Sequence, residues 1–391
     1  MSLDLHTAEA IPERAREEIE RVLQSGDLFR YHSQNAPVTL LEQEFAEMMG
    51  SKFALAVASC SAALFLSLRA LDLPKGAKVL IPGFTFAAVP SSVVHAELTP
   101  VLVEVGENYR MDMADFEAKL TDDIKAVLVS HMRGHTSDMD TIMRLCDAKG
   151  VPVIEDAAHS LFTKWNDKKI GTIGKVGCFS FQSYKLLNAG EGGILITDDE
   201  DIIARTIIMS GAYESNWQKH GMDTNVFGKY QNKLPLYNTR LSNLSAILVR
   251  AQLAEVQRRA DDGLRNHDAL AEILSAHPAL SVPSSLEPEH RAPDSMQFNL
   301  VDFSDDEAQS FAAICKDMDL GLGIFGLQSG NARAFWNWQF LEDQQELPQT
   351  RAMLMRACDI RLPARLSLDQ VKEIGERILS AVNKVKQAKA A

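Results

Sequence analysis

Seven short apolar runs rich in β-branched residues recur between residues 53 and 199, with helical patterns between several of them. Such alternation is typical of a mostly parallel sheet covered by helices. The sequence therefore predicts an α/β fold. The predicted strands are 53–58, 78–81, 99–105, 126–131, 151–155, 178–181 and 193–197, and the predicted helices between them are 62–71, 84–94 and 139–148.

The chain has a second part after these strands. A long helical pattern starts near residue 244, and a proline-containing segment then leads to further strand and helix signals and a last helix at about 371–385. With 391 residues, 46% of them apolar, the chain is long enough for two cores. We therefore expect a large domain over 1–249 and a smaller C-terminal α/β domain over 250–391.

Charge, termini and cysteines exclude several classes of protein. The net charge of −13 does not provide the clustered basic surface that binds nucleic acid. We find neither a secretory signal nor a stretch long enough to cross a bilayer, so no membrane partner is expected. The cysteines are odd in number and show no CxxC spacing, which argues against disulfides and a metal site and favours the cytoplasm. They are Cys60, Cys146, Cys178, Cys315 and Cys358.

Two predicted strands end in side chains that can do chemistry. Ligands bind at the carboxyl ends of strands in open parallel sheets. The run VIEDAAH, residues 153–159, places acids and a histidine at one such end, although a solvated strand end is an equally simple interpretation. The run CFSFQSYK ends in Lys185 and precedes Gly190, Gly192 and Gly193, whose presence suggests a close backbone approach. A lysine beside an apolar wall loses its proton readily and can attack a carbonyl.

Two strand-to-helix turns also suit a ligand. The turn at 59–64 is built of small residues, and its free amides and helix dipole would suit a phosphate, although Ser59 as a simple N-cap explains the pattern equally well. The turn at 82–86 could place Phe86 over a planar ligand; taken alone, Phe86 is more typical of a core residue.

The order of these motifs resembles that of the DegT/DnrJ/StrS family, which contains sugar aminotransferases of pyridoxal 5'-phosphate (PLP) fold type I. The resemblance runs through nearly the whole chain. The matching motifs are LEQEFAE at 41–47, SCSAAL at 59–64, PGFTF at 82–86, EDAAH at 155–159, GCFSFQSYK at 177–185, GEGG at 190–193, NTRLS at 238–242 and RLP at 361–363.

The resemblance implies catalytic roles for three residues. Lys185 would form the Schiff base with PLP and move a proton between substrate and cofactor. Asp156 would pair with the pyridine nitrogen and keep it protonated. His159 would lie close to the ring. The small-molecule partners would be an amino donor, glutamate or glutamine, and a keto-sugar, cyclitol or related acceptor.

The resemblance also implies how the cofactor is held. Phe86 would stack on the ring, while Ser61 and Ala62, through backbone amides, and Ser180, through its hydroxyl, would bind the phosphate. Asn238 would reach the phosphate of a neighbouring subunit, which implies a homodimer with shared active sites. Cys60 stands where the family usually has glycine, and the segment 213–233 has no match, so the acceptor is not defined.

Three functions other than that of an aminotransferase are possible interpretations of the sequence. The stretch GLGIFG at 321–326 fits a nicotinamide-binding GxGxxG pattern but follows a helical pattern late in the chain, so we interpret it as a chance match. Dehydrating sugar enzymes of the family carry histidine in place of the lysine, whereas Lys185 is present here; a lysine-containing branch that makes an aminohydroxybenzoate stays open. A non-catalytic PLP-fold regulator is the third alternative.

Overall fold

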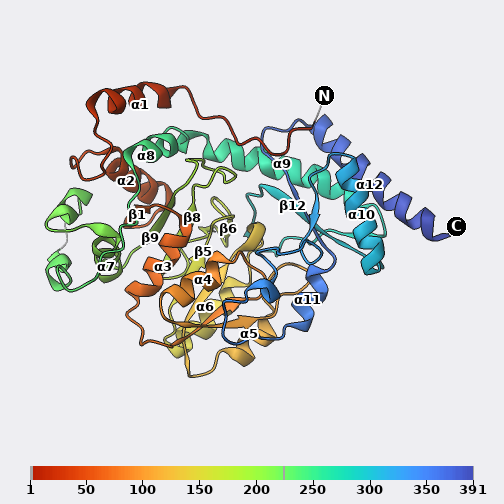
Figure 1. Ribbon diagram of the computed structural model, residues 1–391, viewed down its shortest axis with the longest axis horizontal. Helices are drawn as coiled ribbons and strands as arrows, with labels where there is room; N and C mark the ends of the chain where they lie inside the picture. The colour runs from red at the N-terminus through yellow and green to blue at the C-terminus, as the bar shows by residue number, and fades with distance from the viewer. Residues whose placement is uncertain (1–2, 223–224, 391) are drawn as a thin grey trace.

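The computed structural model describes residues 3–222 and 225–390. Residues 223–224, within the unmatched segment 213–233, and residues 1–2 and 391, at the ends of the two predicted domains, lie outside the described part. The described chain forms two regions, each built on its own β-sheet, and the long helix α9 (Val256–Ser275) extends from one region to the other (Figure 1).

The larger sheet has seven strands, and each coincides with one of the predicted runs. Only β9 runs against its neighbours, so the sheet is mostly parallel, as predicted. In spatial order the strands are β1 (Phe53–Val57), β9 (Gly193–Thr197), β8 (Val176–Ser180), β5 (Val153–Asp156), β4 (Ile124–Ser130), β2 (Lys78–Pro82) and β3 (Thr99–Val103).

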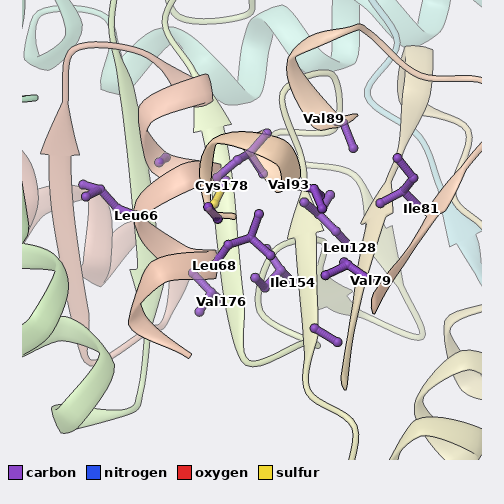
Figure 2. Packing of buried hydrophobic residues seen from close by; sticks show 14 of the residues in the cluster. Leu66, Leu68, Val79, Ile81, Val89, Val93, Leu128, Ile154, Val176 and Cys178 are labelled. Carbon is purple, nitrogen blue, oxygen red and sulfur yellow. The ribbon is translucent and has the colours of Figure 1, made fainter. Parts of the chain in front are cut away.

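Helices cover both faces of this sheet because its strands bury both sets of side chains. Val79 and Ile81 enter one core, which Figure 2 shows, while Leu80 between them enters the other. This alternation follows from the two-residue period of a strand. The first core packs against α3 (Cys60–Ala70), α4 (Ala88–His95) and α7 (Glu200–Gly211), and the second against α2 (Pro37–Met49), α5 (Met113–Lys119) and α6 (Met139–Lys149).

The smaller region has an antiparallel sheet covered by helices. The predicted helix from residue 244 is in fact two, because the chain turns between α8 (Asn243–Arg250) and α9. The smaller sheet consists of β10 (Leu280–Ser281), β12 (Ser295–Leu300), β14 (Ala357–Arg361) and β13 (Gly323–Ile324), with α10 (Asp305–Asp317), α11 (Pro348–Leu354) and α12 (Leu368–Ala390) nearby in the chain.

Some contacts cross the predicted division at residue 250, which stays a prediction. Leu3 and Leu5 belong to the core of the smaller region, although they come from the start of the chain. The GxGxxG match lies on β13 and does not open a helix, so its context excludes a dinucleotide fingerprint. The remaining elements are α1 (Arg14–Ser25), β6 (Lys164–Trp165), β7 (Lys168–Lys169), β11 (Glu289–His290), and 3-10 turns at Met132–Gly134, Asn216–His220, Asn225–Lys229, Leu253–Glu255 and Phe335–Asn337.

A buried cluster around Glu42 of helix α2 includes Arg30 and also His220, which belongs to the segment 213–233. Arg30 donates to both carboxylate oxygens of Glu42 at 2.8 and 2.9 Å, and the amide of Ala56 donates to Glu42 at 2.9 Å. His220 lies 3.1 Å from the same carboxylate. Because several donors surround the carboxylate of Glu42, its charge is stabilised in the interior. Within residues 3–222 and 225–390, no helix is both long and apolar enough to cross a bilayer.

Candidate active site

A cavity of about 400 Å³ opens at the carboxyl ends of the strands of the large sheet. The loops that follow β1, β2, β5 and β8 all reach it, which agrees with the usual position of ligands in such sheets. Six of the eight predicted site residues line it, and they come from four separate stretches of sequence. They are Ser61, Phe86, Asp156, His159, Ser180 and Lys185.

Lys185 lies in the loop after β8, in contact with a histidine. Its Nζ is 2.7 Å from Nε2 of His159. Burial lowers the pKa of Lys185 to about 8, and the nearby charge of Arg133 acts in the same direction, while Asp294 and Asp156 partly oppose the change. A lysine with this pKa is partly neutral near pH 8 and can act as a nucleophile.

His159 is held neutral between Lys185 and a carboxylate. Burial, together with the charge of Lys185, lowers the pKa of His159 to about 3. Its Nδ1 lies 3.6 Å from Oδ2 of Asp294. Burial alone would raise the pKa of Asp294, but the interactions with His159, Lys185 and Arg133 outweigh it and hold that pKa well below its usual range. The neutral ring can therefore accept a hydrogen bond from Lys185 through Nε2.

Asp156 ends strand β5, and several donors fix its carboxylate. The hydroxyl of Ser130 donates to Oδ2 at 2.8 Å, and the hydroxyl of Thr85 donates to Ser130 at 2.7 Å. The amide of Ala158 donates to Oδ1 at 3.1 Å, and the thiol of Cys60 lies 3.8 Å from the same oxygen. These donors hold the carboxylate and fix its direction.

The start of α3 forms an amide-lined turn at the cavity. Ser59 is the N-cap, as the simpler interpretation held: its hydroxyl accepts from the amide of Ala62 at 3.1 Å. The first helical hydrogen bond runs from Ala63 to Ser59, so the amides of Cys60 and Ser61 precede it. Ser61 therefore has an amide suited to a phosphate, whereas that of Ala62 is already bonded to the cap and Ala62 does not line the cavity.

Gly193 brings strand β9 against this turn. A Cβ atom at Gly193 would lie 2.4 Å from both the nitrogen of Cys60 and the carbonyl carbon of Ser59. Only glycine fits so close to backbone, so the predicted close approach is confirmed at this position. The GEGG motif thus shapes the turn at the start of α3.

Phe86 and Asn238 occupy different surroundings. Phe86 is 46% exposed and lines the cavity, so its interpretation as a core residue is wrong. Asn238 does not line the cavity; the adjacent Thr239 accepts a hydrogen bond from Ala58 at 2.8 Å, which places this segment beside the end of β1. The expected role of Asn238 in a neighbouring subunit stays a prediction.

Sequence reasoning missed several residues around the site. Ser130 ends strand β4 and Arg133 follows it, and the same rule that drew attention to the other strand ends would have found them. Asp294 and Arg333 come from the smaller region, more than a hundred positions from Lys185, and no local pattern marks them. Their contribution required the folded structure.

The whole chain was compared with known families. Residues 9–379 match the model of the DegT/DnrJ/EryC1/StrS aminotransferase family. The chain belongs to this family. The match confirms the predicted family, and the α/β fold with its mostly parallel sheet is also confirmed. It does not test which residues bind a cofactor.

Individual members of the DegT/DnrJ/EryC1/StrS family are similar over long stretches. The spore coat polysaccharide biosynthesis protein SpsC of Bacillus subtilis (strain 168) is 35% identical over 67% of this chain and 66% of its own length. GDP-perosamine synthase of Vibrio cholerae is 34% identical over 56% of this chain and 57% of its own. The matches thus span between about half and two thirds of these relatives.

A solved structure shares the fold almost completely. The crystal structure of 3-amino-5-hydroxybenzoic acid synthase matches with a TM-score of 0.85 over 97% of this chain and 99% of that chain. Its sequence identity of 22% is low, so the likeness establishes the arrangement of helices and strands alone.

Proposed function

We propose that this DegT/DnrJ/EryC1/StrS protein is a PLP-dependent aminotransferase. It moves an amino group from glutamate or glutamine to a keto-sugar, cyclitol or related ketone or aldehyde in polysaccharide or secondary-metabolite biosynthesis. The observation that carries the proposal is the cavity shared by Lys185 and Asp156, with the pKa of Lys185 lowered to about 8. The similarity to SpsC and GDP-perosamine synthase supports a sugar-derived acceptor.

The side chains of the cavity fit PLP. The amide of Ser61 and the hydroxyl of Ser180 suit its phosphate, and the carboxylate of Asp156 suits a protonated ring nitrogen. Phe86 offers an aromatic face to a planar ring. When bound, PLP supplies a sink for the electrons left behind when a substrate carbon loses its proton.

Each residue has a defined role in this reaction. Nζ of Lys185 would hold the cofactor covalently and, when free, would carry a proton to and from the substrate carbon. Neutral His159 accepts from Nζ at 2.7 Å and so orients that amine. Asp156, held by its hydrogen bonds with Ser130 and Ala158, would face the ring nitrogen and keep it protonated.

Dehydration is the alternative chemistry. The lysine-containing branch that makes an aminohydroxybenzoate shares the fold, but the 22% identity does not extend to its reaction. Lys185 favours transamination, because a lysine can both return a proton and reattach the cofactor, whereas the histidine of the dehydrating sugar enzymes cannot reattach it. A regulator without activity would have little need for Lys185, Asp156 and His159 in one cavity.

The protein is further proposed to act as a homodimer in the cytoplasm. The position of Asn238 at the edge of the large sheet supports a shared site, and two-fold symmetry is the commonest arrangement of soluble oligomers. All five cysteines are free thiols, which suits a reducing compartment. Sedimentation at working concentration tests the dimer, and an active PLP-loaded monomer would contradict it.

A half-reaction screen tests the reaction class. The PLP-loaded protein is mixed with single amino acids, and the change in cofactor absorbance is followed; candidate keto-sugars are then added to restore the spectrum. We expect glutamate or glutamine to convert the enzyme without an acceptor, and parallel double-reciprocal lines in steady state. Borohydride reduction and peptide mapping should place the pyridoxyl mass on Lys185.

Product mass separates transamination from dehydration. Transamination replaces a carbonyl oxygen of the acceptor with an amino group and removes no hydroxyl. A product that lacks a hydroxyl, or a reaction that proceeds without a donor, would establish the dehydratase alternative. Recovery of the pyridoxyl mass on another lysine would overturn the assignment of Lys185.

A further inference from the structure

One cation of the cavity has no anion bound to it. The guanidinium of Arg333 has no hydrogen bond or ion pair with any residue that the structure describes, and its Nε is buried without a partner. Burial and the charge of Arg133 lower the pKa of Arg333, and Asp359 only partly opposes them. Arg333 is partly buried, and an unpaired charge in such a place carries a desolvation cost, so it is expected to meet an anion that binds from outside.

Three carboxylates around the cavity are already engaged. Asp359 accepts from Arg133 through Oδ2 and from Gln297 through Oδ1, the latter at 2.8 Å. Asp294 faces His159, and Asp156 is bonded by Ser130 and Ala158. None of these three carboxylates forms a hydrogen bond or ion pair with Arg333, and neither does Glu191, which also lines the cavity.

The guanidinium is held in place by the surrounding structure. Ala334 forms a backbone bridge with Phe84, which fixes the segment of Arg333 against the turn after β2. The guanidinium carbon lies 5.7 Å from the ring centre of Phe86 and 6.0 Å from that of Phe325. These are cation–π contacts at the outer end of their range, and they leave the N–H groups of the guanidinium available for a planar anion.

The anion is distinct from the cofactor phosphate. The amides at the start of α3 follow β1, whereas Arg333 is joined to the turn after β2, and four strands, β9, β8, β5 and β4, lie between β1 and β2. We infer that Arg333 binds a carboxylate of a substrate that enters this cavity. This inference rests on the proposed aminotransferase function and requires that at least one of its two substrates is an acid: the carboxylate belongs to the amino donor or to the acceptor.

Binding of glutarate, a dicarboxylate with no amino or keto group, tests the inference without turnover. The PLP-loaded protein is titrated with glutarate and with neutral glutaramide in a calorimeter. Arg333→Gln should weaken glutarate binding at least about tenfold, since a charge-assisted bond to a partly buried cation is lost. Arg333→Lys should recover part of it, because the charge stays and the fork is lost. Arg16→Gln, at a side chain that is 80% exposed, is the matched control and should behave as the wild type.

The source of the carboxylate follows from the donor half-reaction. If it belongs to the donor, Arg333→Gln raises the glutamate concentration for half-maximal conversion about tenfold or more. If glutamate is unaffected while glutarate binding is weakened, the carboxylate belongs to the acceptor. Glutarate that binds equally to both variants, or not at all to the wild type, overturns the inference, and so does loss of PLP from Arg333→Gln. A wild type that binds glutarate through Arg333 but converts with no amino acid would refute the proposed transamination and leave the carboxylate site standing.

Discussion

Uptake of PLP by the cofactor-free protein should accelerate with pH and reach half its maximal rate near pH 8. Only the neutral amine of Lys185 can attack the cofactor aldehyde, and burial lowers its pKa to about 8. At pH 7.5 about a quarter of Lys185 would be neutral, against about 0.1% of an ordinary lysine with a pKa near 10.4. The structure thus increases the fraction of neutral amine at pH 7.5 by about two orders of magnitude.

Two charged residues near Lys185 should shift the pH of the half-maximal rate in opposite directions, and this can be tested. Asp294 raises the pKa of Lys185 and Arg133 lowers it, although burial has the larger effect. Asp294→Asn should therefore move the half-point to lower pH, and Arg133→Gln should move it to higher pH. The two shifts in half-point should be opposite, because one variant removes a negative charge from the cavity and the other removes a positive charge.

The assay measures initial rates of PLP attachment from about pH 6 to about pH 10, a range that brackets the lowered and the ordinary lysine pKa. Borohydride stops the reaction, and mass spectrometry measures the modified peptide. Rates are divided by those of a free lysine analogue at the same pH, which removes the ionisation of the cofactor itself. A half-point near pH 10, or equal shifts in both variants, would refute the reasoning.

Three further predictions concern the frame of the site. Asp156→Asn should keep the fold and some PLP but lower turnover about 100-fold, because the ring nitrogen loses its anion; unchanged turnover contradicts the role. Gly193→Ala should weaken PLP binding and cost about 1–3 kcal/mol in urea unfolding, since the Cβ lies 2.4 Å from backbone, whereas Gly228→Ala, in open space, should match the wild type. Glu42→Gln should cost about 3–5 kcal/mol by leaving Arg30 unpaired in the interior, and an effect no larger than that of Glu44→Gln, at a partly exposed surface pair, would contradict it.

Local sequence patterns predicted the strands well because their cause is local. Each run combines apolar and β-branched residues that bury both faces of a strand, and its position does not depend on distant partners. The boundary of the long helical pattern was less well predicted. The pattern continues through the turn between Arg250 and Val256, because apolar spacing alone does not show where a helix bends.

The sequence predicted those residues of the candidate site that lie at the end of a strand or just after it. Lys185, Asp156, Phe86 and Ser180 follow strand ends, so one topological rule places them at one edge of the sheet. The same rule could not tell that Phe86 would be exposed. That outcome depends on the loops packed around the turn after β2.

The sequence by itself determined the strands, the edge at which the chemistry lies and the family to which the chain belongs, since these depend on short-range patterns and on the order of motifs. Only the tertiary structure decided the order of strands, the contact between Lys185 and His159, and the arrival of Asp294 and Arg333 from the smaller region. The reason is physical. Burial and neighbouring charges set a pKa and the need for a counter-ion, and both are properties of residues brought together in space.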